Sequence, residues 1–201
     1  YFVLVPYLYL IFFTPLNMSK KDIRALSKNQ LRTFFVEKGD KPFRGNQVYE
    51  WLWSKTAHTF EDMTNLSKET RDMLEQHFTI NHIEVDDMQR SKDGTIKNAV
   101  RLHDGLIVES VLIPTSDRTT ACVSSQVGCS LDCEFCATAQ LKRMRNLNAD
   151  EIYDQVAAIN LESIKTHRHK LSNIVYMGMG EPLMNYNNVI KSIEMITSEE
   201  G

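Results

Sequence analysis

The stretch that decides the fold is residues 129–136, CSLDCEFC, in which Cys129, Cys133 and Cys136 follow a C-x-x-x-C-x-x-C spacing. A fourth cysteine, Cys122, precedes them in ACVSSQVGC. All four cysteines of the chain fall in this region, whereas a secreted disulfide scaffold would scatter them along the sequence. The clustering therefore predicts a reducing compartment and a metal or catalytic site.

A tetrahedral zinc site is one interpretation of these cysteines, but it needs four ligands, usually arranged as two close pairs. Here three cysteines lie within eight residues. The histidines to recruit, His167 and His169 of THRHK, stand among basic residues, as solvated histidines usually do. A redox pair is a second interpretation, since CEFC is a C-x-x-C unit, but Cys129 fits it poorly.

An iron–sulfur cluster accounts better for the spacing, because thiolates are its normal ligands and close cysteines on one loop can hold it. Three protein ligands leave one iron of a cubane cluster open. An open iron allows the cluster to bind and reduce a small molecule instead of only relaying electrons.

A second candidate element is MGMGEP, residues 177–182, which follows the apolar run NIVYMGMG. Its glycines allow the backbone to approach a ligand closely. The stretch is not a dinucleotide-binding fingerprint, because Glu181 and Pro182 stand where a G-x-G-x-x-G pattern would continue. Taken alone, it is equally an ordinary turn between a strand and a helix.

The composition is that of a soluble globular protein, with 201 residues, 42% hydrophobic and 24% charged. A net charge of −3 excludes a bulk polycation, so contact with nucleic acid requires a local patch. One basic stretch, Lys20–Arg44, carries eight Lys or Arg against three Asp or Glu. It predicts contact with RNA, with a solvated helix face as the alternative.

Both ends of the chain differ from an ordinary soluble sequence. Residues 1–17 are apolar and uncharged, yet they fall short of the ~20 residues that span a bilayer and lack the basic start of a signal peptide. We expect them to be translated upstream sequence before Met18, with no stable membrane association; a truncated membrane anchor is the alternative. The stop at Gly201 after a helical pattern predicts a fragment.

The N-terminal part reads as helical. Ser27 and Gln30 have capping-box spacing, and Gly39 can end the helix that they begin. FRGNQVYEWLW, residues 43–53, places Trp51 on the apolar face of a second helix, with Trp53 beside it. A third helix begins at Ser67. We expect the tryptophans to pack in a small core, with stacking on RNA bases as the alternative.

The middle of the chain alternates as strands do. The expected strands are HIEVDDMQ, IKNAVRL, LIVESVLIP and TACVSSQV, at residues 82–89, 96–102, 106–114 and 120–127. Asp-Gly turns between the first three predict two hairpins. A helix capped by Asn148 and Glu151, a buried parallel strand at NIVYMGMG and a helix at NVIKSIEMI follow.

These patterns predict an α/β fold. The expected division is an apolar leader at 1–17, a helical accessory RNA-binding domain at 18–80, a β-hairpin extension at 81–117 and a core at 118–201. Strand, cysteine loop, helix, strand and helix in that order are typical of the start of a β/α series with a parallel sheet.

The cysteine spacing and MGMGEP resemble the radical S-adenosylmethionine (radical SAM) enzymes. The wording of several segments more closely resembles the bacterial dual-specificity ribosomal-RNA and tRNA adenine-C2 methyltransferases. These segments are FRGNQVYEWLW, VESVLIP, CVSSQVGCSLDCEFCATAQ, RNLNADEIYDQV and NIVYMGMGEPLMNYNNV. The resemblance covers about residues 20–201. It implies a partial (β/α) barrel, of which residues 118–201 are the first units.

The resemblance also implies two cofactors and the residues that hold them. Cys129, Cys133 and Cys136 are implied as the ligands of a 4Fe-4S cluster. Phe135 matches the aromatic residue that the radical SAM family places near the adenine of SAM. Gly180 and Glu181 match its GGEP element, which holds the SAM ammonium by a charge-assisted contact.

The implied reaction is methylation of an adenine C2 in 23S rRNA and in tRNA through a methyl-cysteine carrier near the C-terminus of the family, beyond this chain. Cys122 matches the cysteine that resolves the protein–RNA thioether, leaving a disulfide. Glu109 matches the glutamate that assists proton removal from C2. Without the resemblance, Cys122 reads as a buried strand thiol and Glu109 as an outward-facing strand residue.

Further expectations follow from the resemblance. The electron donor is a protein such as flavodoxin or ferredoxin, the location is cytoplasmic, and this segment alone is inactive. Two alternatives remain open: the related antibiotic-resistance methyltransferase that modifies adenine C8, and a non-catalytic zinc-binding RNA module.

Overall fold

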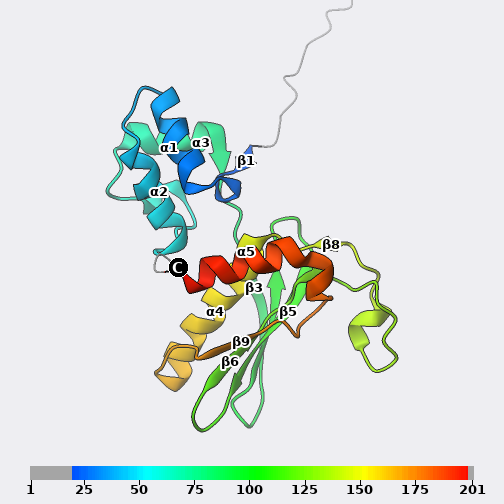
Figure 1. Cartoon of the computed structure of the whole chain (residues 1–201). Helices are drawn as coiled ribbons and strands as arrows, with labels where there is room; N and C mark the ends of the chain where they lie inside the picture. The colour runs from blue at the N-terminus through cyan, green and yellow to red at the C-terminus, as the bar shows by residue number, and fades with distance from the viewer. Residues whose placement is uncertain (1–19, 199–201) are drawn as a thin grey trace, which may run out of the picture.

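The computed structural model describes residues 20–198 (Figure 1), so the predicted leader at 1–17 lies outside the described residues. The described chain forms a mixed α/β structure: a group of short helices is followed by a five-stranded sheet with two longer helices beside it. Within residues 20–198, no helix has both the length and the apolar character to cross a bilayer.

The helical unit contains three α-helices and a small strand pair. Its elements are β1 (Lys21–Asp22), η1 (Ile23–Ala25), α1 (Lys28–Glu37), α2 (Phe43–Trp53), η2 (Phe60–Asp62), α3 (Lys68–His77) and β2 (Phe78–Thr79). The predicted capping box at the start of α1 is confirmed, because Ser27 and Gln30 each accept a hydrogen bond from the backbone of the other. Gly39 follows α1 with φ +77°, a conformation that favours glycine.

Both tryptophans of α2 lie in or against a core, as expected. The more deeply buried of the two is Trp53, which the sequence placed beside the apolar face, and not Trp51, which it placed on that face. Trp53 is only 5% exposed, whereas Trp51 is partly exposed and donates to Asn65 Oδ1. Trp53 is buried because its ring packs edge to face on Tyr153 of helix α4, with ring centroids 5.4 Å apart. Helical periodicity within residues 43–53 carries no information about this distant partner.

The main sheet has the strand order β3-β4-β5-β6-β9. Its strands are β3 (Glu84–Arg90), β4 (Ile96–Arg101), β5 (Ile107–Pro114), β6 (Thr119–Cys122) and β9 (Asn173–Val175). The two predicted hairpins are confirmed: β3, β4 and β5 pair antiparallel, and Gly94 and Gly105 have φ +88° and +81° in the turns between them. β6 pairs antiparallel with β5 and parallel with β9.

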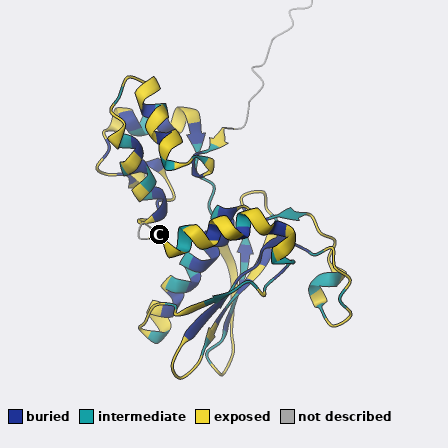
Figure 2. Ribbon diagram, in the orientation of Figure 1, coloured by how far each residue is buried: buried dark blue, intermediate teal, exposed yellow. Residues whose placement is uncertain are grey.

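Helix α4 (Ala149–His167) connects β6 to β9, and α5 (Tyr186–Thr197) follows β9. The predicted capping box of Asn148 and Glu151 begins α4. The core between α4 and the sheet contains Ile96, Val100, Val108, Leu112, Ala121, Ile152, Val156 and Ile159. Figure 2 shows many buried residues in α4 and the sheet, whereas residues 129–144 of the loop after β7 are intermediate or exposed.

Two predicted strands are shorter than expected. Of the apolar run 173–180, only Asn173–Val175 is a strand, and it forms an edge of the described sheet with its residues partly or fully exposed. TACVSSQV divides into β6 and β7 (Gln126–Val127), and β7 leaves the main sheet to pair with β8 (Arg145–Asn146). At the interruption, Val123 O accepts from Gly178 N and Ser125 N donates to Met179 O, both in the turn after β9, whereas the backbone of Ser124 bonds to the Gln155 side chain.

A buried arginine joins the helical unit to α4. Arg24 is 5% exposed, and its two terminal nitrogens each lie 2.7 Å from a carboxylate oxygen of Asp154. It also donates to the carbonyl oxygens of Asn81 and Asp150 and lies 4.9 Å from the ring centroid of Trp53. Arg24 belongs to the basic stretch 20–44, so this charge is used internally.

Candidate active site

The cysteine loop leaves the body of the protein between β7 and β8, which close its base (Figure 1). At the loop end of this strand pair, Met144 N donates to Val127 O over 2.8 Å. Gly128 begins the loop with φ +72°, and a Cβ placed there would lie 2.4 Å from Lys142 O. Only glycine therefore fits where the loop starts.

The three cysteines of the loop are free and partly buried. Cys136 N donates to Cys133 O over 3.0 Å, which forms a turn, and the backbone N–H groups of Ala139 and Thr138 lower the pKa of the Cys136 thiol. Leu131 N donates to Cys129 Sγ over 3.4 Å. These backbone donors favour the thiolate form of Cys136.

The chemistry of this donor set fits an iron–sulfur cluster, because three thiols occupy one closed loop and one has a lowered pKa. Within the described part of the chain, no group of three or more His, Cys, Asp or Glu could hold a metal ion as arranged. The loop therefore carries the three thiols without gathering them into a ligand triad.

Exposed apolar side chains gather on the cysteine loop and on the turn after β9. Phe135 is 94% exposed and Met177 is 79% exposed. The remaining members of this group are Leu131, Leu141, Met144, Leu183 and Met184. Exposed apolar side chains on neighbouring segments mark a surface that binds a ligand or a partner.

The turn containing Gly178, Gly180 and Glu181 is bonded along its length to residues 123–126. Gly178 N donates to Val123 O over 3.0 Å, and Met179 N donates to Ser124 Oγ over 2.8 Å. Gly180 has φ +93°, and a Cβ there would lie 2.5 Å from Gln126 Cβ. The turn is therefore packed directly on the segment that leads into the cysteine loop.

The carboxylate of Glu181 accepts a hydrogen bond from Leu183 N over 2.9 Å and caps the short helix η4 (Pro182–Asn185). This contact uses Oε1 alone. Since a carboxylate has about four acceptor sites, capping η4 leaves capacity for a cationic ligand. The resemblance implies a contact of Glu181 with SAM, which stays a prediction. The capping role was not predicted from the sequence.

Cys122 and Glu109 lie on the same face of the sheet. Cys122 pairs with Val111, and Glu109 is two residues from Val111 on the same strand, so alternation directs both side chains to one side. Such diagonal neighbours have Cα atoms roughly 7–8 Å apart. The buried residues Val108 and Leu112 point to the opposite face, toward α4.

The environments of these two side chains differ. Burial raises the pKa of the Cys122 thiol, partly opposed by a hydrogen bond from the Met177 backbone. The Glu109 side chain is 51% exposed and forms an ion pair with Lys97, with 2.9 Å between Nζ and Oε1. Glu109 is thus outward-facing, as its strand position predicted, and it faces the same side as a thiol.

Sequence reasoning missed the buried polar residues beneath the site. Ser124, Gln126 and Gln155 are 0% exposed. Ser124 Oγ donates to Glu109 O and accepts from Met179 N, and the Gln155 amide bonds both backbone groups of Ser124. The available signal was the polar run Ser124–Gln126 inside an apolar pattern, because buried polar groups require partners.

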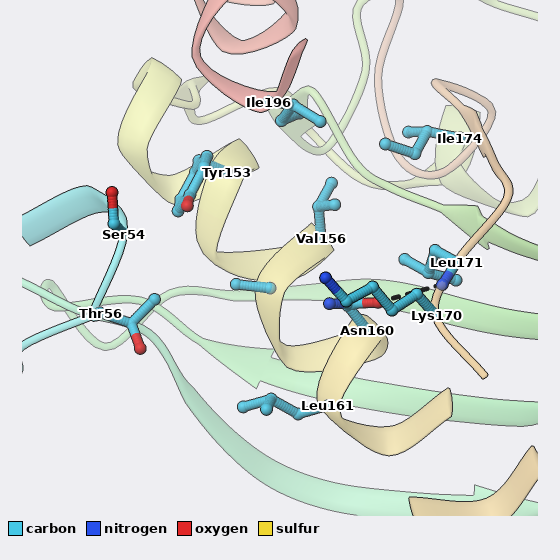
Figure 3. Close-up of a pocket in the computed structure, with 11 residues that line it drawn as sticks. Ser54, Thr56, Tyr153, Val156, Asn160, Leu161, Lys170, Leu171, Ile174 and Ile196 are labelled. Carbon is cyan, nitrogen blue, oxygen red and sulfur yellow. Dashed lines mark hydrogen bonds between the residues drawn. The ribbon is translucent and has the colours of Figure 1, made fainter. Parts of the chain in front are cut away.

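A separate cavity of about 430 Å³ lies between the end of α2 and α4 (Figure 3). Tyr153, Val156, Ile174 and Ile196 line it, and Asn160 at its rim accepts a hydrogen bond from Leu171 N over 3.0 Å. None of the predicted site residues lines this cavity. We therefore assign no part of the site to it.

Among solved structures, the chain is similar to a radical SAM methyltransferase from Sphaerobacter thermophilus. The TM-score is 0.78 with 35% sequence identity, and the match covers 90% of this chain and 53% of that one. The fold and the site together thus define the class of protein: over the aligned residues, the chain has the fold of a radical SAM methyltransferase.

The particular family follows from the sequence comparisons. The family described as "Ribosomal RNA large subunit methyltransferase N-terminal domain" matches residues 21–80. A probable dual-specificity RNA methyltransferase RlmN of Flavobacterium johnsoniae is 76% identical over 186 residues, which are 92% of this chain and 53% of that protein. The RlmN protein of Geotalea uraniireducens is 44% identical, over 92% of this chain and 52% of its own length.

The resemblance predicted from the sequence is confirmed: over the residues that align, the chain is similar to the RlmN RNA methyltransferases. The chain spans about half the length of the curated relatives that it matches.

Proposed function

We propose that the whole protein is a radical SAM methyltransferase that methylates C2 of an adenine in 23S rRNA and in tRNA. The names of its relatives support RNA methylation. The observation that carries the proposal is the adjacency of the cysteine loop and the Gly180–Glu181 turn, which are both fixed on residues 123–127. In this proposal β6, α4, β9 and α5 are the first units of a partial (β/α) barrel.

Cys129, Cys133 and Cys136 would hold a 4Fe-4S cluster, with SAM held by Gly180, Glu181 and the ring of Phe135. When bound, the cluster would supply the electron for reductive cleavage of SAM. In support of this role, the three thiols lie on one exposed loop whose backbone N–H groups donate to Cys129 and Cys136. The Glu181 carboxylate, next to that loop, supplies the negative charge that an ammonium requires.

Glu109 and Cys122 act on the RNA side of the reaction. Glu109 takes the proton from adenine C2, and the Cys122 sulfur attacks the sulfur of the protein–RNA thioether. That attack forms a disulfide with the methyl-carrying cysteine and breaks the carbon–sulfur bond. The bonding electron pair passes to the carbon attached to adenine C2, which takes up a proton and becomes the methyl group. Their shared sheet face supports this division of roles. The four cysteines of this chain are all assigned, so the carrier lies in the part of the protein that this chain does not include.

We also propose the division of the chain and its partners. Residues 18–80 bind RNA, residues 81–117 form a hairpin extension, and residues 118–201 belong to the radical SAM core. A flavodoxin or ferredoxin supplies the electron, and the reaction takes place in the cytoplasm.

The test uses the whole protein, reconstituted without oxygen. We expect iron and sulfide in equal amounts, cleavage of SAM under reduction, and methyl groups located at adenine C2 by mass spectrometry. Cys133→Ala should abolish iron binding and SAM cleavage together. A methyl group at C8 would favour the antibiotic-resistance type of enzyme, and zinc without SAM cleavage would favour the non-catalytic RNA module.

A further inference from the structure

Gln126 occupies an unusual position at the base of the site. It is the first residue of β7, and its side chain is 0% exposed although it is polar. Its Cβ and Cγ lie directly beneath Gly180, where an added Cβ would come within 2.5 and 2.7 Å of them. Its backbone N–H also donates to Met179 O over 3.2 Å. The Gly180–Glu181 turn therefore packs directly on the Gln126 side chain.

The Gln126 amide is held in one orientation by two partners. Its Oε1 accepts from Glu181 N over 2.9 Å, and its Nε2 donates to Asn146 Oδ1 over 2.7 Å. A backbone N–H can only donate, so the oxygen of Gln126 must face Glu181. Its nitrogen must then face Asn146.

The same logic fixes Asn146, the last residue of β8. With its oxygen turned to Gln126, its nitrogen donates to Met184 O over 3.2 Å, and a carbonyl can only accept. Arg143 Nη2 also donates to Asn146 Oδ1 over 2.9 Å, in agreement with this orientation. The two amides thus form a relay that begins at Glu181 N, in the turn, and ends at Met184 O, in the helix η4 that follows it.

This relay joins three segments. Gln126 stands just before the cysteine loop and Asn146 stands just after it. Glu181 ends the turn after β9, and Met184 belongs to the short helix η4 that follows it. A ligand that contacts both a cysteine-held group and Glu181 requires a fixed separation between them, since a displacement of about 1 Å can cost 100-fold in rate. The cysteine loop itself is exposed, so its placement relative to the turn must come from its base.

We propose that Gln126, through Asn146, is a positioning residue that sets the placement of the Gly180–Glu181 turn relative to the cysteine loop and thereby the affinity for SAM. This inference rests on the proposed function for the identity of the ligand. The relay itself is a property of the chain and is testable without any ligand.

The first experiment measures hydrogen exchange of the chain without ligand in Gln126→Leu and Asn146→Asp. Asp keeps the acceptor that faces Gln126 but loses the donor to Met184 O. The matched control is Gln155→Leu, because Gln155 is equally buried and bonds Ser124 and Glu151, not the turn. We expect about tenfold faster exchange at Glu181 N in Gln126→Leu, with no selective change at that amide in the control.

Exchange at Glu181 that follows global stability equally in both glutamine variants would overturn the positioning role. If Gln126→Leu does not fold, Asn146→Asp decides the matter, because a working relay predicts faster exchange in residues 181–184 of that variant as well. Unchanged exchange there would equally contradict the proposal.

The second experiment measures SAM binding to the reconstituted whole protein. We expect Gln126→Leu and Asn146→Asp to weaken SAM binding about tenfold and raise the KM for SAM, with iron content at the wild-type level. Wild-type affinity in both variants would overturn the inference. If the wild-type protein itself bound no SAM, the proposed function would fail, while the exchange experiment would still decide whether the relay positions the turn.

Discussion

Gly128 is the residue on which the cysteine loop depends for its direction. Its φ of +72° and the contact of 2.4 Å that a Cβ would make with Lys142 O act together. Gly105 has a similar φ of +81° but nothing within 4 Å of its Cβ position. We expect Gly105→Ala to lower the free energy of unfolding by about 1 kcal/mol through backbone strain alone. Gly128→Ala should cost about 2–4 kcal/mol because backbone atoms must also move.

The measurement is urea unfolding of both variants beside the wild type. Equal losses at the two positions would show that the close approach of Gly128 to Lys142 does not constrain the loop.

Cys136 and Cys122 have different surroundings and should therefore differ in reactivity. Backbone donors lower the pKa of Cys136, whereas burial raises the pKa of Cys122. Since the thiolate is the reactive form, iodoacetamide at pH 7.5 should alkylate Cys136 several times faster than Cys122 in the metal-free, reduced chain. Peptide mass spectrometry over a time course measures both rates. Faster labelling of Cys122 would contradict the assigned environments, and labelling in urea provides the control in which the two rates converge.

Among the elements, the start of α4 carries a partly buried carboxyl, Asp150, beside the helical unit. Burial raises the pKa of Asp150 to about 6, against an opposing effect of Arg24. A carboxyl with a raised pKa binds its proton more tightly in the folded state. Stability from this group is therefore fully present below about pH 4 and is lost as the pH rises through about 6.

Asp150→Asn should remove this dependence. The stability difference between variant and wild type should grow by about 2–3 kcal/mol between pH 4 and pH 7 in favour of the variant, as measured by urea unfolding at several pH values. Asp93→Asn is the control of opposite sign, since a hydrogen bond from Thr95 N lowers the pKa of Asp93. A flat difference for Asp150→Asn would refute the buried assignment.

Local signals predicted most of these elements. The capping boxes at Ser27 and Asn148 and the Asp-Gly turns are set by neighbouring residues, so they are legible in the sequence. Long-range contacts were not legible. β9 is shorter than its apolar run because the chain turns at Gly178 to bond Val123, 55 residues earlier in the sequence. No periodicity within residues 173–180 reports that partner.

The site shows the same division. The spacing of the cysteines and the Gly-Glu-Pro turn are sequence features, and they drew attention to two segments that the fold brings together. The polar residues that join those segments, above all Gln126, have no local pattern of their own. Their role follows only from burial and from the direction of each hydrogen bond.

At the scale of the whole molecule, the basic stretch 20–44 divides into internal and external charges. Arg24 is buried and bonded to Asp154. Lys38 is exposed, and its Nζ lies 2.7 Å from His77 Nε2. Arg32 and Lys41 are exposed. The charge count of the sequence therefore overstates what the helical unit offers to RNA, and an RNA contact in this unit must rely on its exposed members.

If the helical unit binds RNA, Arg32→Gln combined with Lys41→Gln should weaken binding of the chain to a 23S rRNA fragment. The loss of about two phosphate contacts should reduce the slope of log K against log salt by about 1.5, measured by fluorescence anisotropy between 50 and 200 mM salt. The control is Lys92→Gln combined with Lys165→Gln, which removes the same charge from exposed positions outside the helical unit. This double variant should leave the slope unchanged. Equal slopes for both double variants would show that the RNA senses only the net charge and not the helical unit.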